Sequence, residues 1–454
     1  MEKGKLTYIS LLFIHIGIGV LVYLIPFLSK IYSFLILGAG LYYVVQRKNR
    51  NNEVLYVAAY LVGSEVFLRM TGGNPFHELT KYSVILFMIL GMVYSGISKG
   101  STPFWIYLLF LLPAVYVATE TLNFETDMRK AIMFNLSGPL CLGFAAIYCH
   151  RRRITLEELN NVLFALALPI LCILTYVFLF NPSIKDVVVD TQSNHETSGG
   201  FGPNQVATIL GLGVFIFFSR IVLLSKSRSV LILNLAICTF MTFRGIVTFS
   251  RGGMMTAALM ILLLMGLLFI FMKQRGKLRI IQMLVLGLVL LSGVWVYSSS
   301  QTSGLIERRY ANEGVHGNKK ESQLSGREDL MESELKMFFE NPVFGIGVGK
   351  NREFREEQTG IQAASHNEIT RMLAEHGSFG LVGFIILLIV PFVLYLDNRM
   401  HIYMLSFYVF WLLTLNHAAM RTAAPAFIYA LTLLKVYALE KPVVHREQAL
   451  GEGV

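Results

Sequence analysis

The feature that most constrains this chain is the repetition of apolar runs long enough to cross a lipid bilayer. A membrane-spanning helix needs roughly 20 mainly apolar residues, and such runs recur along almost the whole sequence. Hydrophobic residues form 54% of the 454 residues and charged residues 15%, whereas soluble domains are typically about 45–50% apolar and about 25% charged. One soluble core cannot bury this excess. The sequence therefore predicts an all-α polytopic membrane protein.

The apolar runs also predict the number of transmembrane helices. Several of the runs are short, and we therefore expect about 12–14 spans. The candidate spans are residues 7–28, 31–46, 54–70, 82–97, 104–119, 131–149, 162–180, 204–224, 229–248, 253–272, 280–298, 378–396, 402–416 and 422–438.

The positions of the basic residues predict the orientation of these spans. The net charge of +10 comes from short basic clusters between apolar runs, which is the positive-inside pattern. If the N-terminus is cytoplasmic, every second loop is basic, and both termini are expected in the cytoplasm. A nucleic-acid site would instead concentrate charge on one soluble face, so we expect no nucleic acid partner. The basic loops contain Arg47, Lys48 and Arg50; Lys99; Arg151, Arg152 and Arg153; Lys226 and Arg228; Lys273, Arg275, Lys277 and Arg279; Arg399; and Lys441 and Arg446.

The chain divides into three parts around one long outer loop. Residues 1–298 are predicted to form transmembrane helices with short loops, residues 299–365 the large loop, and residues 366–454 a helix with the catalytic motif and the C-terminal spans. The large loop is not basic, and long loops escape the positive-inside bias. Within it, residues 327–340 are expected to form an amphipathic helix on the membrane or on the bundle. The apolar positions at helical spacing are Leu330, Met331, Leu335, Phe338 and Phe339.

Sequence patterns that bind metal ions or nucleotides are missing. There is no HExxH, no DxD in an outer loop and no GxxxxGK[ST], so we expect no metal ion, no ATP and no cofactor. The cysteines lie in or at the ends of apolar runs and form no CxxC pair, which favours small buried residues over a metal site or a disulfide. They are Cys141, Cys149, Cys172 and Cys238.

His366 is the residue that best fits proton transfer. It ends the large loop in the sequence Ser365-His366-Asn367-Glu368, at the outer boundary of the membrane. Histidine has the side chain whose ordinary pKa best suits general base catalysis near neutral pH. At this depth it can meet a lipid-linked substrate and a water-soluble one. The alternative interpretation is a polar residue that caps a helix or binds water at the interface.

Arginines on the outer side are candidates for binding phosphate. Arg251 lies between Ser250 and Gly252, and Arg244 lies seven residues earlier, where a tight hairpin between two spans is expected. A guanidinium is a planar fork that suits phosphate oxygens, and the neighbouring glycines allow a substrate to approach the backbone closely. The alternative is that these arginines only reach out of the membrane to the interface.

Further outer arginines have structural alternatives. Arg371 is spaced to pair with Glu368 or Glu375 on one helix, and Arg421 fits either a site or an anchor of the last span. Glu65 and Arg69 are expected to neutralise each other's charge inside the third span. Arg327 follows Ser325-Gly326 and is the remaining candidate.

Together these motifs resemble those of the bacterial O-antigen ligase family, in order and in spacing. The resemblance covers about residues 195–395 by motif and the whole chain by topology. The matching segments are Gly202-Pro203-Asn204-Gln205, similar to the family's entry to a span; Ser250-Arg251-Gly252, similar to its arginine motif; Ser325-Gly326-Arg327 and the segment 341–347, similar to the region before its histidine; and His366-Asn367, nine residues, Gly377, two residues and Gly380, which matches its histidine motif.

The resemblance implies a fold, an activity and a location. The family is shared by O-antigen ligases, O-antigen polymerases and protein O-oligosaccharyltransferases, which resemble the GT-C class of membrane glycosyltransferases. It implies a multi-pass protein of the bacterial inner membrane whose active site faces the periplasm, with the large loop on that side. The substrates would be an undecaprenyl pyrophosphate-linked glycan donor and a lipid A-core acceptor, surrounded by membrane lipids. These ligases usually have twelve spans, fewer than the upper end of our estimate.

The resemblance also implies roles for individual residues in a metal-independent, inverting transfer. His366 would be the general base, and Arg251, with Arg244 and Arg327 as further candidates, would stabilise the pyrophosphate. Other possible substrate contacts are Asn204, Asn367, Arg371 and Arg421.

Two other functions are compatible with the sequence. The first is an O-antigen or exopolysaccharide polymerase, or a protein O-oligosaccharyltransferase, that uses the same donor. The second is a transporter or flippase for a lipid-linked glycan. Such transporters often contain inverted repeats and broken helices at the midplane. This sequence shows no internal repeat, and its notable charged residues lie mostly at the outer rim, which favours an enzyme.

Overall fold

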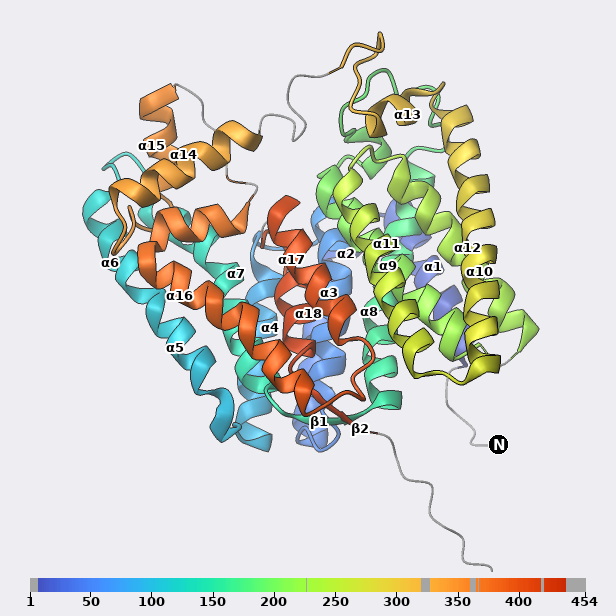
Figure 1. Cartoon of the computed structure of the whole chain (residues 1–454), viewed down its shortest axis with the longest axis horizontal. Coiled ribbons are helices and arrows are strands. Elements are labelled where there is room, and N and C mark those ends of the chain that lie inside the picture. Colours follow the sequence, from blue (N-terminus) through green and yellow to red (C-terminus); the bar gives the residue numbers. More distant parts are fainter. Residues whose placement is uncertain are drawn as a thin grey trace, which may run out of the picture.

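The computed structural model describes residues 7–225, 227–319, 327–359, 365, 367–417 and 420–437. Helices dominate the described chain, and one pair of three-residue strands is the only sheet found in it (Figure 1). The helices are α1 (Tyr8–Leu24), α2 (Leu28–Arg47), α3 (Glu53–Met70), α4 (Leu79–Ser95), α5 (Thr102–Phe110), α6 (Leu112–Thr121), α7 (Met128–Cys149), α8 (Leu156–Phe180), α9 (Pro203–Leu223), α10 (Arg228–Ile246), α11 (Arg251–Phe271), α12 (Gln274–Gln301), α13 (Leu305–Tyr310), α14 (Arg327–Glu340), α15 (Lys350–Thr359), α16 (Glu368–Leu396), α17 (Met404–His417) and α18 (Ala424–Leu431), and the strands are β1 (Arg153–Thr155) and β2 (Lys435–Tyr437).

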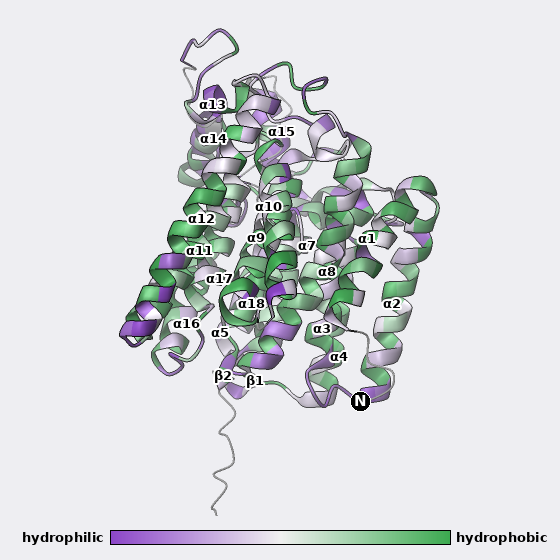
Figure 2. Cartoon of the chain, turned by 90° about the vertical axis from the view of Figure 1, so that its right-hand side faces the viewer, coloured by the Kyte–Doolittle hydropathy of each residue, from purple (hydrophilic) through white to green (hydrophobic). Residues whose placement is uncertain are grey.

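The helices confirm an all-α polytopic membrane protein. Within the described ranges, nine helical segments are long and apolar enough to cross a membrane, and α1 and α4 are apolar helices of 17 residues each. Helices α8 and α9 are mostly buried inside the protein, whereas α12 lies at the edge and exposes its apolar side chains. Hydrophobic residues cover the sides of the bundle, and hydrophilic residues gather toward its ends (Figure 2).

Two predicted spans contain shorter helices than expected, although Lys99–Thr121 as a whole is long and apolar enough to cross a membrane. Residues 104–119 form two helices, α5 and α6, which meet at Leu111 because Pro113 occupies the first turn of α6 and cannot continue the hydrogen bonds of α5. The predicted span over residues 422–438 contains a helix much shorter than expected, although the segment still runs from the histidine end of the bundle, at Arg421, to the strand β1 at the other end. Helix α18 has only eight residues, and the chain then forms β2, which pairs in parallel with β1. Its apolar residues are buried against protein, as Phe427 and Ile428 show with 0% exposure.

The basic loops meet at one end of the bundle, which we call the basic face. There the Nη2 of Arg152 donates to the carbonyl of Gly96 at 2.9 Å, and the Nη2 of Arg151 lies 3.5 Å from a carboxylate oxygen of Asp397. The β1–β2 pair lies at the same end (Figure 1). Helices α13, α14 and α15 lie at the opposite end, which we call the loop face.

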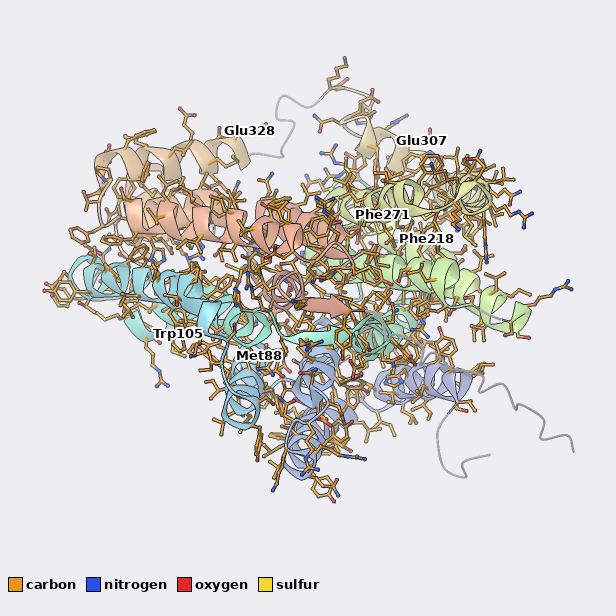
Figure 3. The ribbon with its side chains drawn as sticks, turned by 60° about the horizontal axis from the view of Figure 1, so that its bottom comes forward. Met88, Trp105, Phe218, Phe271, Glu307 and Glu328 are labelled. Atoms are coloured by element: carbon orange, nitrogen blue, oxygen red, sulfur yellow. The ribbon has the colours of Figure 1, made fainter. Side chains whose placement is uncertain are left out.

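The side chains follow the same division. The exposed carboxylates of Glu307 and Glu328 belong to α13 and α14 at the loop face (Figure 3). Apolar side chains on the sides of the bundle, such as Trp105 and Phe271, are 44% and 59% exposed. Met88, by contrast, is fully buried in the packed interior.

Candidate functional site

The histidine motif lies at the start of α16, which consists of two parts. Asn367 is the N-cap, and its side-chain oxygen accepts from the amides of Ile369 at 2.8 Å and Thr370 at 3.3 Å. The first part ends at Gly377, whose φ of 58° and ψ of −139° interrupt the helix before the long apolar part begins. Only glycine adopts this conformation readily. The nine-residue spacing between Asn367 and Gly377 is therefore the length of one short helix before a kink.

The segment 341–349 closes the end of this short helix. The amides of Ile346 and Gly347 donate to the carbonyls of Ala374 and Glu375 at 2.9 and 3.2 Å, which would otherwise lack partners at the helix end. The backbone can come this close because Gly345, with a positive φ of 71°, has no Cβ, which would lie 2.4 Å from the backbone of Glu375; the neighbouring Gly347, with a φ of 96°, packs closely on Ala118 of α6. We call residues 341–349 the clamp segment. It ties the loop-face helices to the histidine motif.

We expect Gly347→Ala to destabilise the folded protein. A left-handed conformation costs a residue with a Cβ roughly 1–2 kcal/mol, and a Cβ at Gly347 would lie 2.7 Å from the backbone nitrogen of Ala118. The matched control is Gly317→Ala, because Gly317 has a similar φ of 80° but no heavy atom within 4 Å of the added Cβ. The thermal midpoint of purified protein should fall clearly further for Gly347→Ala. Equal midpoints would show that the close contact between Gly347 and Ala118 of α6 contributes no stability.

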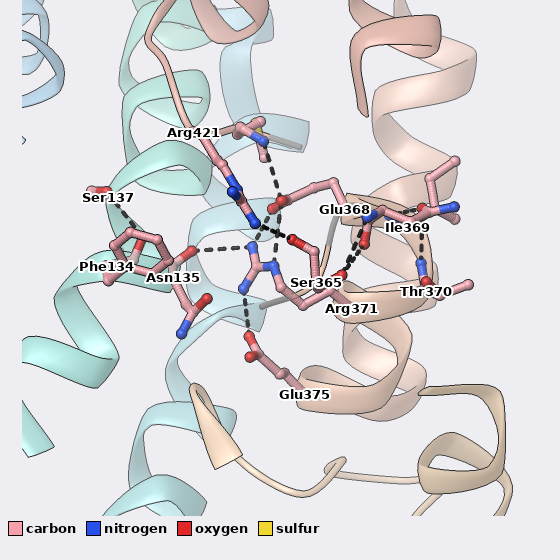
Figure 4. A network of polar contacts seen from close by, with 12 residues as sticks. Phe134, Asn135, Ser137, Ser365, Glu368, Ile369, Thr370, Arg371, Glu375 and Arg421 are labelled. Atoms are coloured by element: carbon pink, nitrogen blue, oxygen red, sulfur yellow. Dashed lines mark hydrogen bonds and ion pairs between the residues drawn. The ribbon is translucent and has the colours of Figure 1, made fainter. Parts of the chain in front are cut away.

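A buried ion network surrounds Arg371 on the short helix (Figure 4). Its guanidinium pairs with the carboxylates of Glu368 and Glu375, and its Nη2 donates to the carbonyl of Asn135 on α7 at 3.1 Å. Glu375 also accepts from the amide of Gly349 at 3.0 Å. The pairing of Arg371 with its neighbours on the helix is thus confirmed, and it involves both carboxylates. The network joins the short helix, α7 and the clamp segment.

Arg371→Ala is expected to lower the free energy of unfolding by about 3–5 kcal/mol, because it leaves two buried carboxylates without their counter-charge. The control is Arg151→Ala. The Arg151–Asp397 pair is 55% and 73% exposed, and exposed pairs contribute about 0–1 kcal/mol. Thermal unfolding of both purified variants measures the difference. A small effect at Arg371 would contradict the importance of the network.

Glu334 on α14 is a further buried carboxylate at this site. It accepts from Thr370 on the short helix at 2.5 Å and pairs with Arg355 on α15 at 2.9 Å. Burial raises the pKa of the Glu334 carboxyl above its usual range, and the bond from Thr370 and the charge of Arg355 oppose that shift. Glu334 was not predicted as a site residue from the sequence. It occupies an i+4 position after Leu330, and a carboxylate on an apolar helix face is the signal that could have revealed it.

The amphipathic helix itself occupies the expected range but buries a different face. Helix α14 spans Arg327–Glu340, and Met337 is buried with Glu334. Phe339, which the apolar pattern assigned to the packed face, is 74% exposed. The buried face is thus centred on a polar contact to the short helix.

Arg421 connects the histidine motif to α3. Its Nη2 donates to the carbonyl of Ser365 at 2.8 Å, while its own carbonyl accepts from the Nη1 of Arg69 at 2.9 Å. Arg69 pairs with Glu65 at 2.6 Å within the buried part of α3, and Glu65 also accepts from the amide of Ala423. Glu65 and Arg69 therefore neutralise each other as expected, and they also hold the segment that carries Arg421.

A second group of motif residues lies at the ends of α9, α11 and α17. The hydroxyl of Ser250 donates to the side-chain oxygen of Asn204 at 2.7 Å. Arg251 is the first residue of α11 and is half-buried, with its Nη1 3.3 Å from the carbonyl of Arg309. The ring of His417 lies against Gly252, where an added Cβ would come within 2.6 Å of it. The glycine after Arg251 therefore leaves room for this histidine.

One hydrogen bond joins this group to the histidine motif. The side-chain nitrogen of Asn367 donates to the side-chain oxygen of Asn416 at 2.8 Å. Asn416 precedes His417, whose Nε2 lies 3.1 Å from the hydroxyl of Thr208 on α9. The structure thus brings Asn204, Arg251 and Asn367 into one neighbourhood at the loop face.

The structure does not place three of the predicted site residues in this neighbourhood. Arg244 is fully buried, with its guanidinium 4.1 Å from the centre of the Phe178 ring and its Nη2 donating to the carbonyl of Asn181 at 2.7 Å. Its contacts are thus with α8 and the loop that follows it. Arg327 begins α14, but its side chain lies outside the described residues, and so does His366. Their roles stay predictions.

The expected absence of a metal ion also stays a prediction. Among the residues that the structure describes, no three His, Cys, Asp or Glu side chains are gathered as a metal site requires.

Comparison with known protein families adds independent support. Residues 236–385 match the model of the O-antigen ligase family. The resemblance to this family is confirmed. The matched segment includes Arg244, Arg251, Arg327, His366 and Arg371, while Asn204 and Arg421 lie outside it. A search of curated proteins found no match.

The family match supports a broad function. It indicates an O-antigen ligase or polymerase type of activity and a glycosyltransferase-like membrane enzyme. It also implies a lipid-linked glycan donor and a lipid acceptor in general terms. The chain is a multi-pass membrane protein.

Proposed function

We propose that this protein is an O-antigen ligase, which transfers a glycan from undecaprenyl pyrophosphate to a sugar hydroxyl of lipid A-core on the periplasmic face of the bacterial inner membrane. The observation that supports it best is the bond between Asn367 and Asn416. It brings the neighbour of His366 to the helix end that packs on Gly252, the neighbour of Arg251. A base and a phosphate-binding arginine would thus meet at one place.

In the proposed reaction, His366 accepts the proton of the acceptor hydroxyl. The hydroxyl oxygen then bonds to the anomeric carbon of the donor sugar, with inversion, as the bond from that carbon to the pyrophosphate oxygen breaks. Undecaprenyl pyrophosphate leaves with the bonding electrons. Arg251 stabilises this developing charge through its planar fork, with Arg327 and Arg244 as further candidates. The mechanism uses neither a metal ion nor ATP.

The acceptor decides between the functions of the family. Purified protein is incubated with a lipid-linked glycan donor and lipid A-core, and the products are separated by mass. A glycan joined to lipid A-core supports the ligase. Donor units joined to one another would instead identify a polymerase, and no transfer to either would overturn both.

The orientation can be tested at Asn318, which is exposed on the segment that follows α13. We expect a cysteine at Asn318 to react with a membrane-impermeant thiol reagent in whole cells whose outer membrane has been permeabilised, because the loop face is proposed to be periplasmic. The control is a cysteine at Arg275, which is exposed at the basic face and should react only after lysis. The reverse pattern would overturn the orientation.

A further inference from the structure

A cleft of about 520 Å³ opens at the loop face beside the histidine motif. Its walls are the first turns of α7 and helix α15, and its floor includes Glu368 and Arg371 of the short helix. The two walls are joined, because Glu353 of α15 accepts from the backbone amide of Asn123, before α7, at 3.1 Å. Sites for small molecules are typically about 300–1,000 Å³, so the cleft has room for more than one sugar ring.

The side chains that line the cleft combine both signs of charge. A phosphate-binding site would be expected to be lined by cations alone, whereas the four carboxylates here would repel a bound phosphate. A sugar hydroxyl both donates and accepts a hydrogen bond, so it can use cations and carboxylates together. The cationic residues are Lys81, Lys130, Arg352, Arg371 and Arg421, and the anionic ones are Asp127, Glu353, Glu356 and Glu368.

One aromatic ring stands in the wall of this cleft. Phe134 is 41% exposed, and its ring stacks on that of His77 with centroids 6.3 Å apart. The face of an aromatic ring carries partial negative charge and suits the C–H groups on the flat side of a sugar ring. Apart from one glycine, the other apolar lining residues are Ala131 and Met420.

We propose that the cleft is a saccharide subsite, which holds sugar units of one of the two lipid-linked substrates next to the transfer centre. The inference rests on the proposed function for this placement. Ser365 and Glu368 line the cleft and lie on either side of His366 and Asn367 in the sequence. Sugars in the cleft therefore extend to the position where the acceptor hydroxyl and the donor sugar react. The sugars of the acceptor core and of the donor glycan both offer hydroxyl groups and C–H faces. The effect of cleft substitutions on the KM of each substrate distinguishes the two.

The test uses Phe134→Ala and Lys130→Ala in the purified full-length protein. Lys130 is exposed in the cleft wall. Each substitution should raise one substrate's KM by about two- to tenfold, with a smaller effect on kcat. A higher KM for lipid A-core assigns the cleft to the acceptor, and a higher KM for the lipid-linked donor assigns it to the donor glycan. Unchanged KM values for both substrates would overturn the proposal.

Neighbouring residues provide matched controls. Arg129 and Met133 are exposed on the same turns of α7 but do not line the cleft. Arg129→Ala and Met133→Ala should leave both KM values unchanged. If they raise KM as much as the cleft variants do, the effect belongs to α7 as a whole and the subsite is refuted.

A binding measurement tests the proposed saccharide subsite without relying on enzymatic turnover. A cysteine replacing Lys130 is labelled with an impermeant maleimide, in a Cys238→Ser background because the other cysteines are buried. Lipid-free core oligosaccharide, or glycan released from the donor, should slow labelling at least threefold, and inorganic pyrophosphate should not. Protection by a saccharide in a protein without transfer activity would refute the proposed function but keep the subsite. Normal transfer without protection, or protection by pyrophosphate alone, would refute the subsite and keep the function.

Discussion

His366→Ala is expected to lower the kcat of glycan transfer by about 10²–10⁴-fold, the usual contribution of a general base. The substitution removes the group proposed to accept the proton of the acceptor hydroxyl, and the pyrophosphate-binding arginines stay in place. The donor's binding affinity should therefore change much less than kcat. The measurement is the initial rate of transfer by purified variants that show the same monodispersity and thermal midpoint.

His316→Ala is the control for this prediction, because His316 is exposed on the segment after α13 and should tolerate the change. His376→Ala should also retain much more activity than His366→Ala. His376 is only 1% exposed, so its variant must be compared at equal amounts of folded protein. Full activity of His366→Ala across the pH range where imidazole titrates would refute the general base and leave at most a positioning role.

Arg251→Ala should abolish transfer, and Arg251→Lys should restore only part of it. Lysine keeps the positive charge but loses the planar fork that binds two phosphate oxygens at once. Loss of one preorganised charge-stabilising donor typically costs about 10²–10³-fold in kcat.

Arg308→Ala is the matched control for the arginine. Arg308 is exposed on α13, next to the residue whose carbonyl contacts Arg251, and its loss should leave kcat and both KM values close to normal. Near-normal donor binding and turnover in Arg251→Ala would move the pyrophosphate role to Arg327 or Arg244. Because Arg244 is fully buried on Phe178, its substitution must be judged with a thermal unfolding measurement beside the rate.

Local patterns in the sequence predicted the parts of this structure that depend on near neighbours. Apolar runs predicted the helices, and the i+3 and i+4 spacing predicted the pairs of Arg371 with Glu368 and Glu375. The spacing of basic residues predicted which loops share one face. In each case the partners are separated by a few residues or by one physical rule that applies along the whole chain.

Contacts between distant residues could not be predicted in this way. Glu334 bonds to Thr370 across 36 positions, and the carbonyl of Asn181 accepts from Arg244 across 63. An apolar run also does not reveal whether lipid or protein will cover it. The apolar residues of helix α18 are buried against protein, which the sequence of residues 422–438 did not show.

The β1–β2 pair has a consequence for biosynthesis. Strand β1 leaves the ribosome before the chain has passed its middle, and its only described pairing partner, β2, is among the last described residues to be made. Since chains grow at about 5–20 residues per second, β1 must wait for tens of seconds before β2 is made. The pairing of β2 with β1 at the basic face is then a late step of assembly. A ribosome that stalls before Lys435 would leave a membrane-inserted bundle without the β1–β2 pair, which the cell's quality control could recognise.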